Sequence, residues 1–354
     1  MKKAVVFAAI FYFHSVAPCA AVLLEPGDIV VVNKDDASLG FGGLGNLVRV
    51  NPTTGQQTLI STGGSLYDPV YAAMAPDGQI DVVNEQAGGG QLGNVVRVDP
   101  TTGAQTIISS DGYLLNSEGI AIDSHGNLIV AVKDDAALGF GGPGALIRIN
   151  PTTGQQTVIS TAGNFADPVG VAIAKDGQLF VVDDEAFGSP GAVFRVDPTT
   201  GTQTVISAAG FFENPEGIAI DATGDLIVVD KGNASHPPGK LIRVNPLTGA
   251  QSLIASGGRL FSPTGVAINA DGTFIVVDEQ AGSSDALGSV IRVDPITGSQ
   301  TTISSGGYFL NSIGDAIVPE ALPVVPEPSS LLLLGAGLLG LVGGGVLRRR
   351  DGRC

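Results

Sequence analysis

The sequence has few of the residues on which exported proteins and enzymes most often rely. Its 354 residues include no tryptophan, three histidines and two cysteines, Cys19 and Cys354. Both cysteines lie in terminal segments, so the body of the chain has no disulfide and is held together by packing. The body also lacks a Gly-x-Ser-x-Gly turn, a phosphate-binding loop and the Cys/His spacing of zinc sites. It therefore carries no signature of a serine hydrolase, a nucleotide-binding enzyme or a zinc protein.

Basic residues are also scarce. Lysine and arginine number 18 against 34 aspartates and glutamates, which gives a net charge of −16. Most of the imbalance lies in the body, because residues 22–320 hold twelve basic and 32 acidic side chains, a net charge of −20. Such a surface repels nucleic acid and favours cations or cationic partners. We therefore expect no nucleic-acid partner.

The first 21 residues predict a secretory signal peptide. Lys2 and Lys3 give it a positive start, residues 4–13 are apolar, and the small residues 19–21 form a cleavage site before Val22. Cys19 leaves open a lipoprotein anchor, although the preceding proline fits that motif poorly. In either case the chain is expected to be exported.

The body is rich in glycine, with 51 in the chain, and one segment recurs in it six times. One copy is LIRINPTTGQQTVIS, residues 146–160. The turns of the six copies begin at Asn51, Asp99, Asn150, Asp197, Asn245 and Asp294. Asn or Asp followed by Pro starts a turn, and the later Gly accepts a positive φ, so each copy reads as a β-hairpin. A period of this length indicates a solenoid, a propeller or an array.

Each repeat contains four short strand-like stretches, for example residues 217–221, 225–230, 240–245 and 250–255. Four antiparallel strands with tight turns match one propeller blade, so we predict an all-β, six-bladed β-propeller over residues 22–320. The first repeat starts at its second strand, residues 27–33, and a surplus first strand, residues 312–318, follows the last repeat. We expect this C-terminal strand to close the ring, which leaves no free edge and fits a monomer.

The blade pattern GIAIDxxGxLIVVD, as in residues 217–230, resembles the NHL, SMP-30 and streptogramin-lyase group of six-bladed propellers. The resemblance implies the fold and carries no catalytic signature. Odd repeats have RVNP or RINP and even repeats have RVDP, which indicates a two-blade unit repeated three times. One arginine recurs on the third strand of every blade: Arg49, Arg97, Arg148, Arg195, Arg243 and Arg292. We interpret these arginines as structural charge partners.

The alternation of strands sorts the connections onto two faces. The short connections, first to second strand and third to fourth, share what we call the turn face, and the long, variable ones share the loop face. Binding residues concentrate in variable loops on a rigid scaffold, so the loop face is the predicted binding face. Its acidic residues near the second strands are Asp35, Asp36, Glu85, Asp134, Asp135, Asp183, Asp184, Glu185, Asp230, Asp278 and Glu279.

Glu118 and Glu216 precede the innermost strand in two blades, where other blades have apolar residues or threonine. Together with Asp183, Asp230 and Asp278 they are candidate ligands of Ca²⁺ or another divalent cation at the mouth of the channel. The resemblance to the SMP-30 group implies a catalytic metal at this place, but the asparagine that the group uses in another blade is absent. The alternative is a solvated acidic rim without a metal.

Histidine and aromatic residues add little to an enzymatic interpretation. Only His236 falls on the loop face, and streptogramin lyases, which depend on a histidine base, would need a second histidine beside it. Aromatic residues in the connections from each fourth strand to the next blade are Tyr67, Tyr113, Phe165, Phe211, Phe212, Phe261, Tyr308 and Phe309. They either contact a sugar or peptide or pack between the blades.

The C-terminal segment resembles a PEP-CTERM sorting signal. Its parts are, in order, Pro326, Glu327 and Pro328, the apolar residues 331–347, and the basic Arg348, Arg349 and Arg350. We expect residues 321–330 to be a linker and residues 331–354 a transmembrane sorting helix with a basic tail. The resemblance implies processing by an exosortase and release to the envelope or extracellular matrix of a Gram-negative bacterium. Permanent anchoring in the membrane is the alternative.

Two functions fit these observations. The first is an exported binding or matrix protein whose acidic loop face meets a polysaccharide, a peptide or a cation. The second is a metal-dependent hydrolase or lyase with its site at the mouth of the central channel. Carboxylates that converge on a pocket would favour the enzyme, and a charged rim would favour the binding protein. The sequence names no catalytic residue and no cofactor other than the candidate cation.

Overall fold

The structure of the chain is a computed structural model. It describes residues 22–34, 44–86, 92–133, 144–188, 190–232, 238–280, 287–310 and 312–317. The predicted signal peptide, linker and sorting helix lie outside these residues. So do five residues that the sequence singled out on the loop face, Asp35, Asp36, Asp134, Asp135 and His236.

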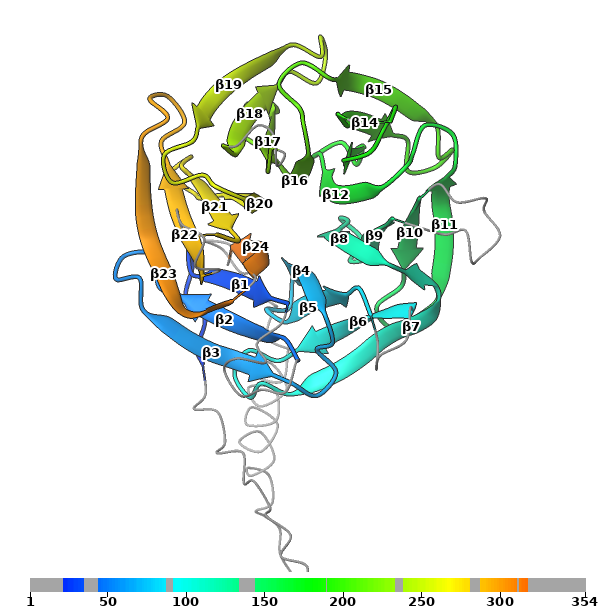
Figure 1. Cartoon of the computed structure of the whole chain (residues 1–354). Helices are drawn as coiled ribbons and strands as arrows, with labels where there is room; N and C mark the ends of the chain where they lie inside the picture. Colours follow the sequence, from blue (N-terminus) through cyan, green and yellow to red (C-terminus); the bar gives the residue numbers. More distant parts are fainter. Residues whose placement is uncertain are drawn as a thin grey trace, which may run out of the picture.

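The regular elements of the described residues are all β-strands, arranged as six four-stranded antiparallel sheets around a central axis (Figure 1). Each sheet is one blade, and its four strands follow one another outward from the axis to the periphery. From the inside outward, blades 1 to 3 are β24 (Ser312–Ile317), β1 (Ile29–Asn33), β2 (Asn46–Val50), β3 (Gln57–Thr62); β4 (Pro69–Met74), β5 (Ile80–Asn84), β6 (Leu92–Val98), β7 (Gln105–Leu115); and β8 (Ser117–Ile122), β9 (Leu128–Val132), β10 (Ala145–Ile149), β11 (Gln156–Thr161). Blades 4 to 6 are β12 (Pro168–Ile173), β13 (Leu179–Asp183), β14 (Ala192–Val196), β15 (Gln203–Ala208); β16 (Pro215–Ile220), β17 (Leu226–Asp230), β18 (Lys240–Val244), β19 (Gln251–Ser256); and β20 (Pro263–Ile268), β21 (Phe274–Asp278), β22 (Leu287–Val293), β23 (Gln300–Leu310).

The predicted closure of the ring is confirmed. β24, from the end of the repeats, pairs antiparallel with β1, from their beginning, with Ile317 opposite Ile29 and Ala316 opposite Val30. Figure 1 shows the two strands side by side in the same blade. The innermost strand also lies against its neighbours β20 and β4, so the inner strands form an unbroken circle. The two ends of the propeller therefore depend on each other.

The hydrophobic core consists of six clusters, one at each seam between adjacent blades. Val30 and Val32 of β1 face blade 2, whereas Ile29 and Val31 face blade 6. Both faces of a blade are thus buried, which explains why the second strands read as continuous apolar runs rather than as alternating ones. The segment that precedes each inner strand adds one buried apolar side chain: Leu66, Leu114, Phe165, Phe212, Leu260 and Phe309.

A glutamine in the recurring hairpin fastens each blade to the preceding one. The Gln156 amide donates to the hydroxyl of Ser109 and accepts a hydrogen bond from the N–H of Tyr113, both in blade 2. Gln57 binds Ser304 and the N–H of Tyr308 in the same way and so spans the closure. The glutamine, the turn and its two strands thus form one unit that each blade needs, which explains why the segment is repeated six times.

Candidate functional site

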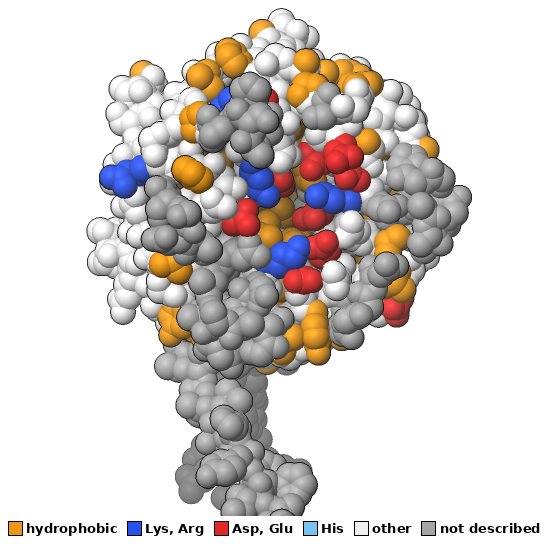
Figure 2. Space-filling view, in the orientation of Figure 1, with side chains coloured by type: hydrophobic (Ala, Val, Ile, Leu, Met, Phe, Trp, Pro, Cys, Tyr) orange, Lys and Arg blue, Asp and Glu red, His pale blue; other side chains and the backbone are white. Residues whose placement is uncertain are grey.

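The loop face carries a ring of alternating charges around the channel. In every blade the first residue after the second strand is ionisable, and it is basic in odd blades and acidic in even ones. This charge ring consists of Lys34, Glu85, Lys133, Asp184, Lys231 and Glu279. Figure 2 shows the loop face, with basic and acidic side chains gathered around the central hollow. The ring follows from the two-blade repeat, because each copy of that repeat supplies one lysine and one acid.

Ion pairs within the ring link neighbouring blades. Lys34 pairs with Glu85 across blades 1 and 2. The Nζ of Lys133 lies 3.8 Å from an oxygen of Asp184 across blades 3 and 4. The Nζ of Lys231 lies 3.9 Å from an oxygen of Glu279 across blades 5 and 6. Each two-blade unit is thus held at the mouth of the channel by its own pair of charges.

Glu118 and Glu216 lie just inside the ring, on the innermost strands β8 and β16, and are 8% and 7% exposed. They occupy the mouth of the channel as the sequence predicted, but each faces a lysine. The Nζ of Lys133 is 3.5 Å from Glu118, and the Nζ of Lys231 is 3.0 Å from Glu216. Each of these lysines therefore serves two carboxylates, one in its own blade and one in the next.

Burial changes the protonation of these groups. Loss of solvent raises the pKa of Glu118 to about 7, although the charge of Lys133 opposes the shift. Burial also raises the pKa of Asp184 to about 7, again against the pull of Lys133. Burial alone would lower the pKa of Lys133, but the surrounding carboxylates, Glu118 first, outweigh it and raise that pKa. Lys133 stays charged while the protonation of its two partners changes near neutral pH.

Asp183, Asp230 and Asp278 end the second strands of blades 4 to 6, and their carboxylates are fully buried. Each accepts hydrogen bonds from backbone N–H groups of the loop that enters its own blade. For Asp278 the donors include Phe261 and Ser262, at 2.7 and 3.0 Å. Burial raises the pKa of Asp278 to about 6, although these N–H groups favour its charged form. The three aspartates thus hold in place the loops that enter blades 4 to 6.

The inner strands pack closely at the floor of the mouth. Gly119, Gly170 and Gly217 of the inner strands lie so close to the next strand that an added Cβ would come within about 2.4–2.6 Å of a backbone oxygen. Blade 2 has Tyr71 at this position, and its hydroxyl donates a 2.6 Å hydrogen bond to the carbonyl of Thr264 in blade 6. The tyrosine thus links two blades that are not neighbours, and together with Gly119, Gly170 and Gly217 it lines a small cavity of about 70 Å³.

The five predicted metal ligands do not converge. Asp183, Asp230 and Asp278 turn to their own loops, and Glu118 and Glu216 pair with lysines. Among the residues that the structure describes, no three His, Cys, Asp or Glu side chains are arranged to hold a metal ion. The metal site stays a prediction. The lysines of the charge ring are the part of the mouth that the sequence reasoning missed, and aligning the repeats at the end of the second strand would have revealed them.

The aromatic residues of the loops divide into two groups. Phe165, Phe212 and Phe309 pack between blades. The loop face exposes a second group: Tyr67 (36%), Phe187 (60%), Phe211 (41%) and Phe261 (39%). Phe187 lies in a loop of blade 4 that the sequence reasoning did not single out. Packing between blades is confirmed for the three buried phenylalanines, and contact of the exposed residues with a sugar or peptide stays a prediction.

The sorting-signal residues Pro326, Glu327, Pro328, Arg348, Arg349 and Arg350 lie outside the described part of the chain. Over the residues that are described, no helix is long and apolar enough to cross a membrane. The expected sorting helix is therefore neither confirmed nor contradicted by the structure.

Comparison with known proteins identifies the C-terminal segment. Residues 324–350 match the PEP-CTERM protein-sorting motif. The chain is therefore an exported, envelope-associated PEP-CTERM protein with a propeller fold, of the kind that Gram-negative bacteria sort with this signal. No curated protein sequence matches the chain.

Solved structures match the propeller at low sequence identity. TolB from Acinetobacter baumannii is 14% identical with a TM-score of 0.61, covering 83% of this chain and 67% of its own. A chain of the nidogen/laminin complex is 16% identical with a TM-score of 0.60, covering 83% and 99%. The periplasmic gluconolactonase PpgL of Pseudomonas aeruginosa is 16% identical with a TM-score of 0.55, covering 84% and 99%. At such identities the likeness shows the fold alone, and it agrees with the predicted six-bladed propeller.

Proposed function

We propose that this exported propeller is a binding protein of the cell surface or extracellular matrix, with the loop face as its binding surface. One observation carries the proposal. Each of the five carboxylates described at the mouth, Glu85, Glu118, Asp184, Glu216 and Glu279, is ion-paired with a lysine. The carboxylates of this mouth are neutralised by lysines, and Tyr71 links blades 2 and 6 at its floor. A ligand would therefore find both charged donors and charged acceptors there, but no open cluster of carboxylates.

The exposed aromatic residues supply the other half of such a surface. Tyr67, Phe211 and Phe261 lie in loops between blades, and Phe187 lies in a loop within blade 4, so all four are on the loop face. Aromatic side chains offer a large contact area at a low entropic cost, and they dominate many binding surfaces. A face with aromatic anchors and paired charges suits an extracellular polymer, either a polysaccharide or a peptide.

The aromatic residues provide the test. We expect Tyr67→Ser, Phe211→Ser and Phe261→Ser together to reduce binding to washed extracellular matrix of the producing bacterium by about tenfold or more, because each anchor contributes about 1 kcal/mol or more. Co-sedimentation of the purified protein with the matrix measures it. Ile107→Ser, Val205→Ser and Leu253→Ser are the matched control, since these side chains are similarly exposed but lie on outer strands. Equal loss in both variants, or none in either, would contradict the proposal. Digestion of the matrix with a protease or with a glycosidase before the assay shows whether the bound polymer is a peptide or a polysaccharide.

A metal-dependent hydrolase or lyase is the second candidate, and one observation favours it. Glu118 is a buried carboxyl group at the mouth of the channel, and burial raises its pKa to about 7. Carboxyl groups with such raised pKa values are common in active sites. The periplasmic gluconolactonase is an enzyme on the same fold. The lysines weigh against this candidate, because the ammonium groups of Lys133 and Lys231 occupy the positions beside the carboxylates that a cation would take.

Calorimetric titration with Ca²⁺, Mg²⁺ and Zn²⁺ separates the two candidates. We expect no saturable binding that depends on Glu118 and Glu216, because a lysine already neutralises each of them. The double variant Glu118→Gln, Glu216→Gln should therefore give the same titration as the unaltered chain, and Glu185→Gln, an exposed carboxylate of the same face, serves as control. Tight binding that only the double variant loses would establish the metal site instead.

A further inference from the structure

The recurring arginines of the third strands have partners of two kinds. Arg49, Arg97 and Arg243 each pair with an aspartate of their own blade. Arg148 lies 3.9 Å from Asp123 of its own blade, and both Arg148 and Arg292 donate to a backbone carbonyl in the hairpin turn of the next blade, at Pro198 and Pro52. Both kinds of contact place the guanidinium on the turn face. They confirm that these five arginines have structural partners.

Arg195 of blade 4 differs from the other five. It forms neither a hydrogen bond nor an ion pair with any residue that the structure describes. The sequence of blade 4 accounts for the missing partner. Ala174 replaces the acid that stands as Asp221 in blade 5, and Phe180 replaces the acid that stands as Asp81 in blade 2. The carbonyl of Pro246 in blade 5, the counterpart of Pro198, does not bind Arg195 either.

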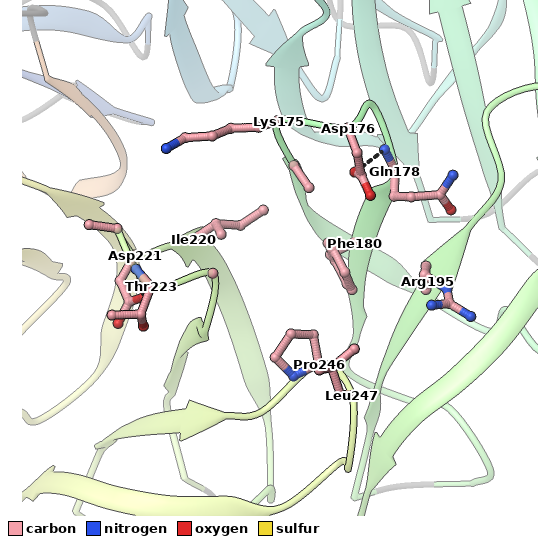
Figure 3. Close-up of a pocket in the computed structure, with 13 residues that line it drawn as sticks. Lys175, Asp176, Gln178, Phe180, Arg195, Ile220, Asp221, Thr223, Pro246 and Leu247 are labelled. Carbon is pink, nitrogen blue, oxygen red and sulfur yellow. Dashed lines mark hydrogen bonds between the residues drawn. The ribbon is translucent and has the colours of Figure 1, made fainter.

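A pocket of about 380 Å³ lies at this place, on the turn face at the seam of blades 4 and 5. Arg195, Phe180, Ile220, Pro246 and Leu247 line it. Figure 3 shows Phe180 and Arg195 on one side, Ile220 and the turn that holds Asp221 on the other, and the turn of Pro246 and Leu247 closing one end. The volume lies within the roughly 300–1,000 Å³ range of small-molecule sites, and most of the lining is apolar.

The charges around the pocket leave Arg195 as its available cation. Asp221 is engaged by Arg243, with 2.5 Å between an oxygen and the guanidinium. Asp176 accepts a hydrogen bond from the N–H of Gln178 at the exposed edge. Lys175 borders the pocket as well, but its amine points away from Arg195 (Figure 3). An anion at Arg195 would meet an unpaired guanidinium, and its apolar part would meet Phe180 and the turn beyond it.

We propose that this pocket binds a carboxylate attached to an apolar group, with the carboxylate on Arg195 and the apolar group against Phe180, Ile220 and Leu247. The guanidinium presents two parallel N–H donors that match the two carboxylate oxygens. Two sources have this chemistry, a free small organic acid and the C-terminus of a peptide that ends in an apolar residue. The site lies on the face opposite the charge ring, so it stands independently of the function proposed for the loop face.

The test uses the full chain in a mild non-ionic detergent, with phenylpropionate, its neutral amide, and two short peptides ending in leucine, one with a free carboxylate and one amidated. We expect saturable calorimetric binding of a carboxylate form and at least about tenfold weaker binding of the matching amide, because hydrogen bonds to charged groups contribute more than one tenfold step in affinity. Tighter binding of the free-carboxylate peptide than of phenylpropionate identifies a chain end as ligand, and the reverse identifies a small acid.

Three variants make the assignment specific. Arg195→Gln should weaken carboxylate binding about tenfold or more. Ala174→Asp restores the internal partner found in blade 5, so it should abolish binding while leaving the propeller at least as stable. Arg292→Gln is the matched control, because Arg292 holds the same strand position and, among the described residues, forms no ion pair within contact distance, although Asp271 of its blade lies in its field. Absence of saturable binding overturns the proposal, as does binding that Ala174→Asp leaves intact or that Arg292→Gln weakens as much as Arg195→Gln.

Discussion

A chain that ends before Ser312 is expected to lose cooperative folding. Without β24, the inner edge of β1 has no partner, and the places that β24 fills beside β20 and β4 are empty. The free energy of unfolding of an ordinary domain is about 5–15 kcal/mol, and an opened ring exposes two seams at once. We expect urea unfolding followed by circular dichroism to become broad and to shift to much lower urea, with aggregation through the exposed edge of β1.

A rearranged chain serves as the control for this truncation. Residues 312–317 are placed directly before Leu24, so that residues 24–28 become the turn between the inner strand and β1. Ile317 already lies opposite Ile29, which makes this connection equivalent to the turns of the other blades. We expect the rearranged chain to regain a single sharp transition. A truncated chain that unfolds as sharply as the intact one would show that the closing strand is dispensable.

Replacing Lys133 with methionine is expected to destabilise the propeller by about 3–5 kcal/mol at pH 8 and far less at pH 5. At pH 8 the substitution leaves two buried carboxylates, Glu118 and Asp184, without their cation. At pH 5 both are already protonated in the folded protein, because burial holds each pKa at about 7. Lys133 then has little charge to neutralise. Urea unfolding at several pH values measures the difference.

The sign of the pH dependence follows from the direction of these shifts. Folded pKa values above the ordinary 4.5 and 3.8 mean that the unfolded chain binds fewer protons than the folded one between about pH 4 and pH 7. The unfolding free energy therefore decreases as the pH rises through this window and levels off above it. Without Lys133 the two pKa values rise further, so the decrease should continue to higher pH.

Two further variants identify the cause. Lys34→Met removes the lysine that pairs with one carboxylate of the charge ring, Glu85. It should lower the free energy of unfolding at pH 8 by less than Lys133→Met does. Adding Glu118→Gln to Lys133→Met removes one of the two stranded charges and should recover part of the lost stability. If Lys133→Met costs the same at pH 5 as at pH 8, its contribution is packing of the side chain rather than charge.

The closure of the ring could be predicted because it leaves a trace in the order of the strands. A repeat that lacks its first strand and a surplus first strand after the last repeat have one simple arrangement in a closed array. The role of Asn and Asp at the start of each hairpin turn could also be predicted, because it involves only neighbouring residues. The side chain of Asn150 accepts hydrogen bonds from the N–H groups of Thr152 and Thr153. Such features depend on residues that are close in sequence or on the repeat itself.

The site was harder to predict, because side chains that meet there are far apart in the chain. Asp183, Asp230 and Asp278 look like free carboxylates at the ends of strands, but the loop that enters each blade covers them with N–H groups. Nothing in the local sequence distinguishes a buried carboxylate that anchors a loop from an exposed one that binds a ligand. That distinction depends on which backbone groups the neighbouring loop brings near.

The repeat period, the missing first strand and the C-terminal motif were enough to determine the six blades, their closure and the export of this protein. The tertiary structure alone decided which charges are neutralised: Lys133 and Lys231 pair with carboxylates of the mouth, whereas Arg195 pairs with no acid among the described residues. The physical reason is that strand pattern depends on local backbone preferences and burial, whereas the pairing of charges depends on distances of a few ångströms between blades. Those distances exist only once the ring has closed.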